Sequence, residues 1–450
     1  MSKKLFNDFS EVSSKEWKQK IQADLKGADY NETLIWKTNE GIDVKPFYHA
    51  DEFPSTPNVS SSKATQWKIC ETIFVSDTEI SNARAKKLLV NGIESLKFII
   101  PSEDISVETL VKDIDLGNTQ VFFELQFLSA SYTDQILKVT SKENTFILTD
   151  IVGNLARSGN WFSNLQEDHT QLETIALKTS TISSDITLYQ NAGANMVQQL
   201  AYALAHVNEY LNHLNNKETL QVVFNVAVGT NYFFEIAKLR ALRVLWRTLA
   251  SEYGNTTECH IFVTPTKRNK TLYDYNTNLL RTTTECMSAV LGGANTINNL
   301  AYDAIYHKDN EFGSRISRNQ LLVLKHESYF DKVDNPADGA FYIESITQQL
   351  AEKALDLFKS IEVGGGFLHQ LKEGIIQRKI KESAEKEQTQ FNTGEEVLLG
   401  TNKHPNPDDK MKHELELYPF LKTNPRKTLI EPIIEKRLAE TLEQNRLKTE

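Results

Sequence analysis

The spacing of apolar residues along the chain predicts a series of short strands separated by helices. The predicted strands are Leu96–Ile100, Val121–Phe127, Phe146–Asp150, Ile182–Tyr189, Gln221–Val228 and His260–Thr264. The helices predicted between them are Val107–Ile114, Asp134–Lys142, Gln171–Lys178, Ala194–Leu214 and Tyr232–Tyr253. This alternation, which begins near Trp67, is typical of βαβ units on a parallel sheet. The number of units favours a (β/α)8 TIM-type barrel over an open sheet.

The rest of the chain is predicted to extend that barrel at both ends. Near the N-terminus the pattern gives one amphipathic helix, Ser14–Lys26, and a polar linker, Pro57–Ser62. Beyond residue 276 the predicted elements are helices: Asn278–Leu291, Arg315–Glu327, Phe341–Ile361, Phe367–Gln390 and, in the tail, Pro432–Lys448. We therefore expect an arm and linker over residues 1–62, a barrel with a helical cap over 63–400, and a linker and helical tail over 401–450.

Composition narrows the classes of protein that fit. Of the 450 residues, 40% are hydrophobic and 24% charged, which is ordinary for a globular protein. The net charge of −10 lacks the basic footprint of a nucleic-acid binder. No apolar run is long enough to span a membrane, and the first residues do not resemble a secretory signal. Three cysteines without a CxxC pair suit a reducing compartment, so we expect a cytoplasmic protein.

Polar residues at the predicted strand ends are the candidates for an independent activity. Asp150, Asp185 and Asn225 lie in or beside predicted strands, and Gly229-Thr230-Asn231 follows one. Catalytic groups of barrel enzymes lie at the carboxyl ends of the strands. A hydrolase or lyase using Asp150 and Asn225 is therefore one open interpretation.

The cysteines and one neighbouring histidine are weaker candidates. We predict that Cys70 is a packed core residue without chemistry. Cys259 and His260 are adjacent, but no further ligand stands at a metal-binding spacing, so no metal site is predicted.

Two other features have structural interpretations. His206 and His213 lie seven residues apart on one predicted helix, where a solvated or capping role is expected. Gly364–Gly366 follows a helix rather than a strand, which predicts a helix stop and not a phosphate cradle.

A further set of segments resembles the adenosylcobalamin-dependent acyl-CoA mutases. Residues 186–194 read Ile-Thr-Leu-Tyr-Gln-Asn-Ala-Gly-Ala, which is similar to the Gly-Tyr-His-x-x-Glu-Ala-Gly-Ala turn of that family. Four more blocks follow family patterns in the same order: Glu40–Tyr48, Ile236–Trp246, Arg281–Asp303 and Arg315–Asn319. The resemblance runs from about Trp36 to Lys403, and it implies a barrel whose axis is threaded by coenzyme A.

The chain departs from the family pattern where the family carries out its chemistry. In catalytic members a tyrosine and a histidine of the turn sit over the substrate carbonyl, and Thr187 and Leu188 stand in those places. A leucine donates neither a hydrogen bond nor a proton.

The cobalamin-contacting positions depart in the same way. Thr72 replaces the family tyrosine that wedges against the corrin, Cys70 replaces a nearby arginine, and Asn298-Asn299-Leu300 replaces His-Thr-Asn. None of the ten histidines follows an aspartate by two places, as the cobalt ligand does. Only about fifty residues follow Gly400, too few for a flavodoxin-like cobalamin domain, so none is expected.

The resemblance and the departures together imply a supporting subunit. No catalytic, cofactor-binding or metal-binding residue is assigned to the chain, and Thr72, Thr187 and Leu188 are treated as lost positions. The implied partner is the large subunit of a heterodimeric methylmalonyl-CoA mutase, which binds adenosylcobalamin and its cobalt. That enzyme interconverts (R)-methylmalonyl-CoA and succinyl-CoA by a radical carbon-skeleton rearrangement. A subunit of a related acyl-CoA mutase, or a scaffold or chaperone for cofactor loading, remains open.

Two structural hypotheses follow from bulky side chains. The predicted strands carry phenylalanines on both faces, which predicts a filled barrel that admits no acyl-CoA: Phe98, Phe122, Phe123, Phe146, Phe224 and Phe262. The arm carries aromatic residues with few neighbours in sequence, which predicts that it wraps onto the large subunit: Trp17, Trp36, Phe47 and Tyr48.

Overall fold

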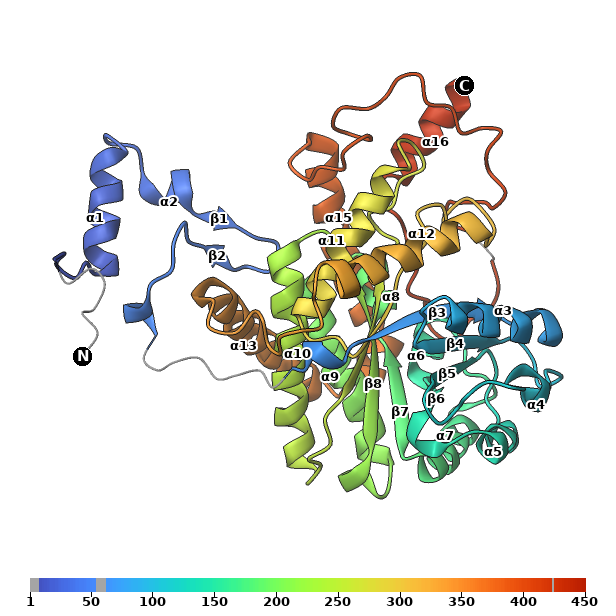
Figure 1. Cartoon of the computed structure of the whole chain (residues 1–450). Helices are drawn as coiled ribbons and strands as arrows, with labels where there is room; N and C mark the ends of the chain where they lie inside the picture. Colours follow the sequence, from blue (N-terminus) through green and yellow to red (C-terminus); the bar gives the residue numbers. More distant parts are fainter. Residues whose placement is uncertain (1–7, 54–61, 423–424) are drawn as a thin grey trace.

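A parallel eight-stranded barrel forms the centre of the protein in a computed structural model that describes residues 8–53, 62–422 and 425–450 (Figure 1). Its strands are β3 (Lys68–Phe74), β4 (Ser95–Ile100), β5 (Gln120–Leu125), β6 (Thr145–Leu148), β7 (Thr181–Asp185), β8 (Gln221–Val228), β9 (His260–Pro265) and β10 (Thr296–Asn298). They lie side by side in the order β6-β5-β4-β3-β10-β9-β8-β7, and every pair is parallel. The predicted (β/α)8 barrel is confirmed.

The barrel is nearly closed, with a seam between its two end strands, β6 and β7. These strands stand at opposite ends of the hydrogen-bonded order. The backbone N–H of Ser183 donates to the Thr149 carbonyl oxygen across the seam at 3.4 Å. The other sheet in the described residues is the small antiparallel pair of β1 (Trp36–Lys37) and β2 (Asp43–Val44).

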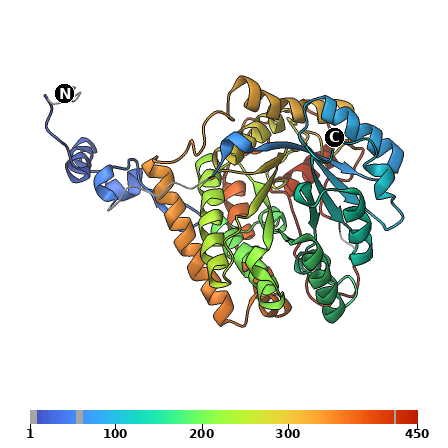
Figure 2. The same ribbon diagram turned by 60° about the horizontal axis from the view of Figure 1, so that its bottom comes forward.

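Helices cover the outside of the barrel (Figure 2). Those that follow barrel strands are α3 (Thr78–Val90), α4 (Val107–Leu110), α5 (Ala130–Val139), α6 (Ile151–Ser158), α7 (Leu165–Thr179), α8 (Thr187–Asn191), α9 (Met196–His213), α10 (Tyr232–Glu252), α11 (Thr277–Leu291) and α12 (Glu311–Leu322). A π-helical turn, Val323–Glu327, continues α12. The cap and tail helices are α13 (Phe341–Val363), α14 (Phe367–Lys372), α15 (Ile375–Thr393) and α16 (Glu440–Thr449).

Aromatic side chains fill the barrel interior. The ring centroids of Phe122 on β5 and Phe262 on β9 are 5.0 Å apart, although β4, β3 and β10 separate these strands. Their contact must therefore cross the inside of the barrel. They belong to a buried group, called the aromatic cluster below, with these members: Cys70, Phe122, Phe146, Leu148, Val223 and Phe262.

The other three phenylalanines face outward. Because successive side chains of a strand alternate between its faces, Phe123 points away from the interior when Phe122 points in. Phe98 and Phe123 pack together in the layer under the helices, and Phe224 contacts Trp246 of α10. Half of the predicted phenylalanines thus fill the barrel, and the other half join it to its helices.

Several predicted elements end earlier than expected. The strand predicted to reach Tyr189 stops at Asp185, because the backbone turns at Ile186 into α8. The helix predicted from Phe367 to Gln390 is split at Gly374, whose φ of 69° lies in the left-handed region. Gly364 ends α13, which confirms the predicted helix stop. The strands β3 and β10 and the helices α3 and α6 were not predicted as separate elements.

The N-terminal arm has two parts that differ in their contacts with the barrel. Its inner part lies on the barrel's own helices, where Trp36 contacts Phe234 and Tyr48 contacts Tyr342. Its outer part, α1 (Ser14–Asp24), has no buried residue and lies away from the barrel in both views (Figures 1 and 2). The helix α2 (Tyr30–Leu34) joins the two parts. Residues 57–61 of the predicted linker lie outside the described residues.

The C-terminal tail is mostly irregular before its last helix and is bound to the carboxyl end of the barrel. The predicted helix Pro432–Lys448 exists only as α16, and the segment before it forms backbone hydrogen bonds instead. The N–H groups of Lys436 and Leu438 donate to the carbonyl oxygens of Asn191 and Arg268. These contacts occupy backbone donors that a helix would have used internally.

Candidate functional site at the carboxyl end of the barrel

Two ion pairs stand where the barrel opens at the carboxyl ends of its strands. Lys97 of β4 lies 2.5 Å from Glu124 of β5, and Arg157 of α6 lies 2.6 Å from Asp185 of β7. The Lys97 charge holds the pKa of Glu124 below its ordinary value. Burial raises the pKa of Asp185 in spite of the nearby guanidinium. These four residues and Asp150 are called the polar mouth below.

Asp150 is held by hydrogen bonds on both carboxylate oxygens. Four donors point at it: the N–H groups of Gly153 (2.7 Å) and Asp185 (2.6 Å), His206 Nε2 (2.8 Å) and the Tyr210 hydroxyl (2.6 Å). Burial would raise the pKa of this carboxyl, but His206, Tyr210 and the Asp185 N–H together hold it below its ordinary value. Asp150 therefore caps α6 and ties β6, β7 and α9 together, which leaves it poorly suited to act as a base.

His206 contradicts the prediction of a solvated or capping residue. Its side chain is fully buried, and its Nδ1 lies within 3.0 Å of the hydroxyl groups of Ser184 and Tyr189. The prediction was wrong because the partners come from β7 and α8, which the helical spacing does not show. His213, on the same helix, is exposed.

A cavity of about 330 Å³ opens beside the seam between β6 and β7. Asp150 and Asn225, which were proposed together from the sequence, both line it. Asn225 is buried, and its side-chain oxygen has no hydrogen-bond partner among the described residues. The same is true of the Ser183 hydroxyl, which also faces this cavity.

Gly229-Thr230-Asn231 lies elsewhere, in a separate cavity of about 520 Å³ under the N-terminal arm. The Gly229 N–H donates to Glu235 at 2.7 Å, and Lys238 lies 2.5 Å from the same carboxylate. Gln190 accepts from Lys238, and burial lowers the pKa of that lysine. The structure thus separates the two halves of the set predicted for an independent activity.

The positions treated as lost are engaged in the fold. Leu188 is completely buried in the main apolar core, and the Thr187 hydroxyl donates to Asp185 at 2.5 Å. Thr72 donates to Asn298 at 3.0 Å, which joins β3 to β10. This bond joins two positions that the sequence predicted as departures from the family pattern.

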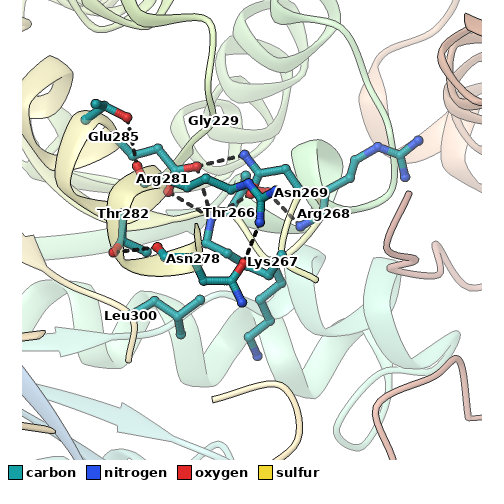
Figure 3. Close-up of polar contacts among 12 residues, drawn as sticks. Gly229, Thr266, Lys267, Arg268, Asn269, Asn278, Arg281, Thr282, Glu285 and Leu300 are labelled. Carbon is teal, nitrogen blue, oxygen red and sulfur yellow. Dashed lines mark hydrogen bonds and ion pairs between the residues drawn. The ribbon is translucent and has the colours of Figure 1, made fainter. Parts of the chain in front are cut away.

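A network of buried charges fixes the loop after β9 (Figure 3). Lys270 pairs with Glu285 at 2.8 Å, and Asn269 donates to the same carboxylate at 2.7 Å. Arg281 donates to Thr271 and Asn278, both at 2.8 Å. Burial lowers the pKa of Lys270 and raises that of Glu285, so each charge depends on its partner.

The predicted core role of Cys70 is confirmed, because it is buried in the aromatic cluster and burial raises its pKa to about 12. His260 contacts the Thr296 hydroxyl at 3.0 Å, and burial with the nearby Arg243 lowers its pKa to about 3. Within residues 8–53, 62–422 and 425–450, no group of three His, Cys, Asp or Glu side chains could hold a metal ion.

Sequence reasoning missed Lys97 and Glu124. Each carries its charge in an otherwise apolar strand, in Leu-Lys-Phe and Phe-Glu-Leu. An isolated charge at an inward-facing strand position was the signal that could have identified the polar mouth.

The fold and the site define a (β/α)8-barrel protein whose carboxyl end carries ion pairs and a hydrogen-bond network around Asp150. A family model described as methylmalonyl-CoA mutase matches residues 119–445. The chain is 34% identical to the methylmalonyl-CoA mutase small subunit of Porphyromonas gingivalis, over 90% of this chain and 71% of that protein. It is 30% identical to methylmalonyl-CoA mutase of Cereibacter sphaeroides, over 86% of this chain and 64% of that protein. The chain belongs to the methylmalonyl-CoA mutase family.

A second small subunit is also similar to this chain. The methylmalonyl-CoA mutase small subunit of Streptomyces virginiae is 26% identical over 88% of this chain and 71% of its own length. Among the described helices of this chain, none combines the length and the apolar character needed to cross a membrane.

Proposed function

We propose that this chain is the non-catalytic small subunit of a heterodimeric methylmalonyl-CoA mutase, and that its large-subunit partner carries the active site. The observation that carries the proposal is the burial of Leu188. Where the family pattern has a histidine over the substrate, this chain has an apolar side chain sealed in its core. A leucine side chain has no proton to donate, so Leu188 cannot act as a general acid on a substrate.

The barrel interior supports the same proposal. Coenzyme A threads the axis of catalytic family barrels, as the resemblance implies, and here the aromatic cluster occupies that space. Phe122 and Phe146 stack at 4.7 Å between ring centroids, and Phe122 meets Phe262 from the opposite strand. We propose that the chain admits no acyl-CoA.

The residues present do not fit adenosylcobalamin. Thr72 has no aromatic ring to place against a corrin, and its hydroxyl already donates to Asn298. The tail segment that carries Lys436 and Leu438 is fixed over α8 and the loop after β9. We propose that the cofactor of the assembly belongs to the partner, and we derive no chemical step on this chain.

The independent hydrolase or lyase is the less supported candidate. It needs Asp150 as a base, and that carboxylate already accepts four hydrogen bonds. Its other proposed residues, Gly229-Thr230-Asn231, line a different cavity.

The outer arm is the proposed contact with the partner. On α1, Trp17 is about half exposed, and the helix has no buried residue. A helix of 11 residues is marginal in water on its own, and α1 meets the rest of the arm only through contacts such as that of Trp17 with Phe47, so a docking surface would stabilise it. We propose that α1 packs on the large subunit, whereas residues 30–53 stay on their own barrel.

Co-expression with the large subunit tests the proposal. Size-exclusion chromatography should give a 1:1 complex that converts methylmalonyl-CoA, while this chain alone is inert and binds no cobalamin. Turnover by this chain alone would overturn the proposal. A stable complex active on another acyl-CoA would assign a related mutase, and only transient association would favour a loading chaperone.

Deletion of residues 1–28 tests the arm. Co-purification should be lost while the thermal unfolding of the remaining chain is unchanged, because α1 contributes nothing to its core. The matched control replaces Lys20 and Asp24, an exposed pair on the same helix, with alanine and should keep the complex. A complex that survives the deletion would show that the interface lies elsewhere.

A further inference from the structure

The cavity beside the β6–β7 seam contains two polar groups that the fold leaves unused. Asn225 is 7% exposed and Ser183 is 1% exposed, and neither the Asn225 side-chain oxygen nor the Ser183 hydroxyl has a hydrogen-bond partner in the described chain. Buried polar groups are nearly always paired, because an unpaired one loses the hydrogen bonds it makes in water. Both line the same cavity, so one occupant can satisfy both.

Strand register explains why these two side chains face the same space. On the paired strands β7 and β8, Ser183 lies opposite Val223, and Asp185 lies opposite Asn225. Val223 belongs to the aromatic cluster inside the barrel. Because side chains two residues apart share a face, Ser183 and Asn225 both point inward, two register positions apart.

The charges around the cavity are already balanced. Glu124 is paired with Lys97, and Arg157 with Asp185. Asp150 is saturated by its four donors. A charged ligand would lose its hydration without finding an unpaired opposite charge, which is costly.

The remaining walls are mixed: Gln126, Thr149 and Asn154 are polar, and an apolar part includes aromatic rings. Phe127 and Leu128 come from the loop after β5, and Phe162 comes from the segment before α7. A volume of about 330 Å³ lies at the lower end of the range of small-molecule sites.

We propose that this cavity is a binding site for a small uncharged molecule that carries a hydrogen-bond donor and an acceptor side by side on an apolar body, as an aromatic carboxamide does. The amide of Asn225 offers an acceptor and a donor to such a group, and the Ser183 hydroxyl supplies either. The apolar body lies against Phe127, Leu128 and Phe162. This site stands apart from the proposed subunit role, since it requires neither a partner nor an acyl-CoA.

The test uses three probes of similar size with the full 450-residue chain: benzamide, benzoate and toluene. Titration calorimetry and ligand-observed NMR should show saturable binding of benzamide. Benzoate should bind at least about tenfold more weakly than benzamide, because its charge loses water without gaining a partner. Toluene should also bind at least about tenfold more weakly, because it leaves Asn225 and Ser183 unpaired.

Two variants place the binding in the cavity. Asn225→Leu should weaken benzamide binding about tenfold or more, and Ser183→Ala should weaken it by a smaller factor. The control Asn298→Leu makes the same chemical change inside the barrel but outside the cavity lining, and should leave benzamide binding unchanged. Ser183→Ala removes a single atom, so it keeps the test usable should Asn225→Leu fail to fold.

Three results would overturn the proposal. The absence of saturation by benzamide would mean that the cavity holds only water. Equal binding of toluene and benzamide would mean that apolar filling, and not the unpaired groups, selects the ligand. Unchanged benzamide binding in both cavity variants would place the site elsewhere.

Discussion

The aromatic cluster and the polar mouth occupy two levels of one barrel interior, but they are stabilised in different ways. The cluster is held by ring packing between strands that face each other across the barrel, as between Phe122 and Phe262. The mouth is held by ion pairs and by the hydrogen bonds at Asp150. Apolar packing has no polar groups that need hydrogen-bond partners, whereas every buried group of a polar network needs one. The side chains of Ser183 and Asn225, which lack such a partner, line the cavity at the polar mouth. Lys97 connects the levels, since it pairs with Glu124 and also lies 5.2 Å from the Phe262 ring centre.

The largest expected effect comes from emptying the aromatic cluster. Phe122→Ala should lower the free energy of unfolding by about 3–5 kcal/mol, because the ring is fully buried and its neighbours are fixed to strands. Urea unfolding followed by circular dichroism measures this. The control Phe74→Ala, at an exposed position of β3, should change it by less than about 0.5 kcal/mol. A loss below about 1 kcal/mol for Phe122→Ala would mean that the interior is not packed around this ring.

Removing the charge of Asp150 in the polar mouth should lower the free energy of unfolding by less than Phe122→Ala does. Asp150→Asn should lower the free energy of unfolding by about 2–3 kcal/mol, since the amide nitrogen would face donors that now point at a carboxylate oxygen. The same urea measurement applies. Asp134→Asn, in a partly exposed pair with Lys178, should cost less than about 1 kcal/mol. Equal losses for both variants would remove the distinction between the mouth and an ordinary surface.

The pair of Lys97 and Glu124 predicts a pH dependence. Its lysine lowers the pKa of Glu124 in the folded state, so its stabilisation is present above the ordinary glutamate pKa of about 4.3 and is lost as the pH falls through the lowered value. Lys97→Met should flatten the dependence of the urea midpoint on pH below about 4.3 and cost about 1 kcal/mol at pH 7, because Glu124 is partly exposed. Lys86→Met, which breaks an exposed pair with Asp113, should leave the slope unchanged. An unaltered slope in Lys97→Met would show that this pair does not contribute.

The smallest expected effect is that the buried cysteine thiols do not react with an alkylating reagent. Burial raises the pKa of Cys70 to about 12 and that of Cys259 to about 11, so neither forms a thiolate at pH 8. Iodoacetamide should label neither in the folded chain and both in urea, as read by intact mass and peptide mapping. Labelling of folded Cys70 would mean that the barrel interior opens to solvent.

The part of the fold that could be predicted is the part encoded locally. The alternation of apolar runs gave six of the eight barrel strands, and β8 matches its predicted limits, Gln221–Val228. The strands that were missed lack that signal, because Lys68, Glu71 and Thr72 interrupt β3 and β10 has three residues. The glycines at 364–366 and 374 act through their own backbone, which is why the first could be recognised as a helix stop.

The candidate site was less predictable, because its partners are distant in sequence. Asp150 and Asn225 do line one cavity, but Asp150 is committed to His206 and Tyr210, about 60 residues further along the chain. Nothing in the helical spacing of His206 shows that Ser184 and Asp150 surround it. Charged residues on different strands, such as Lys97 and Glu124, likewise meet only when the sheet forms.

The sequence alone determined the family and the barrel, because motifs and apolar periodicity are properties of neighbouring residues, and from the same motifs it predicted Thr72, Thr187 and Leu188 as replaced positions. Only the tertiary structure decided which phenylalanines fill the barrel and which groups are left unpaired at Ser183 and Asn225. Whether a strand residue points inward depends on register and on closure of the sheet, and both arise from contacts between strands far apart in the chain.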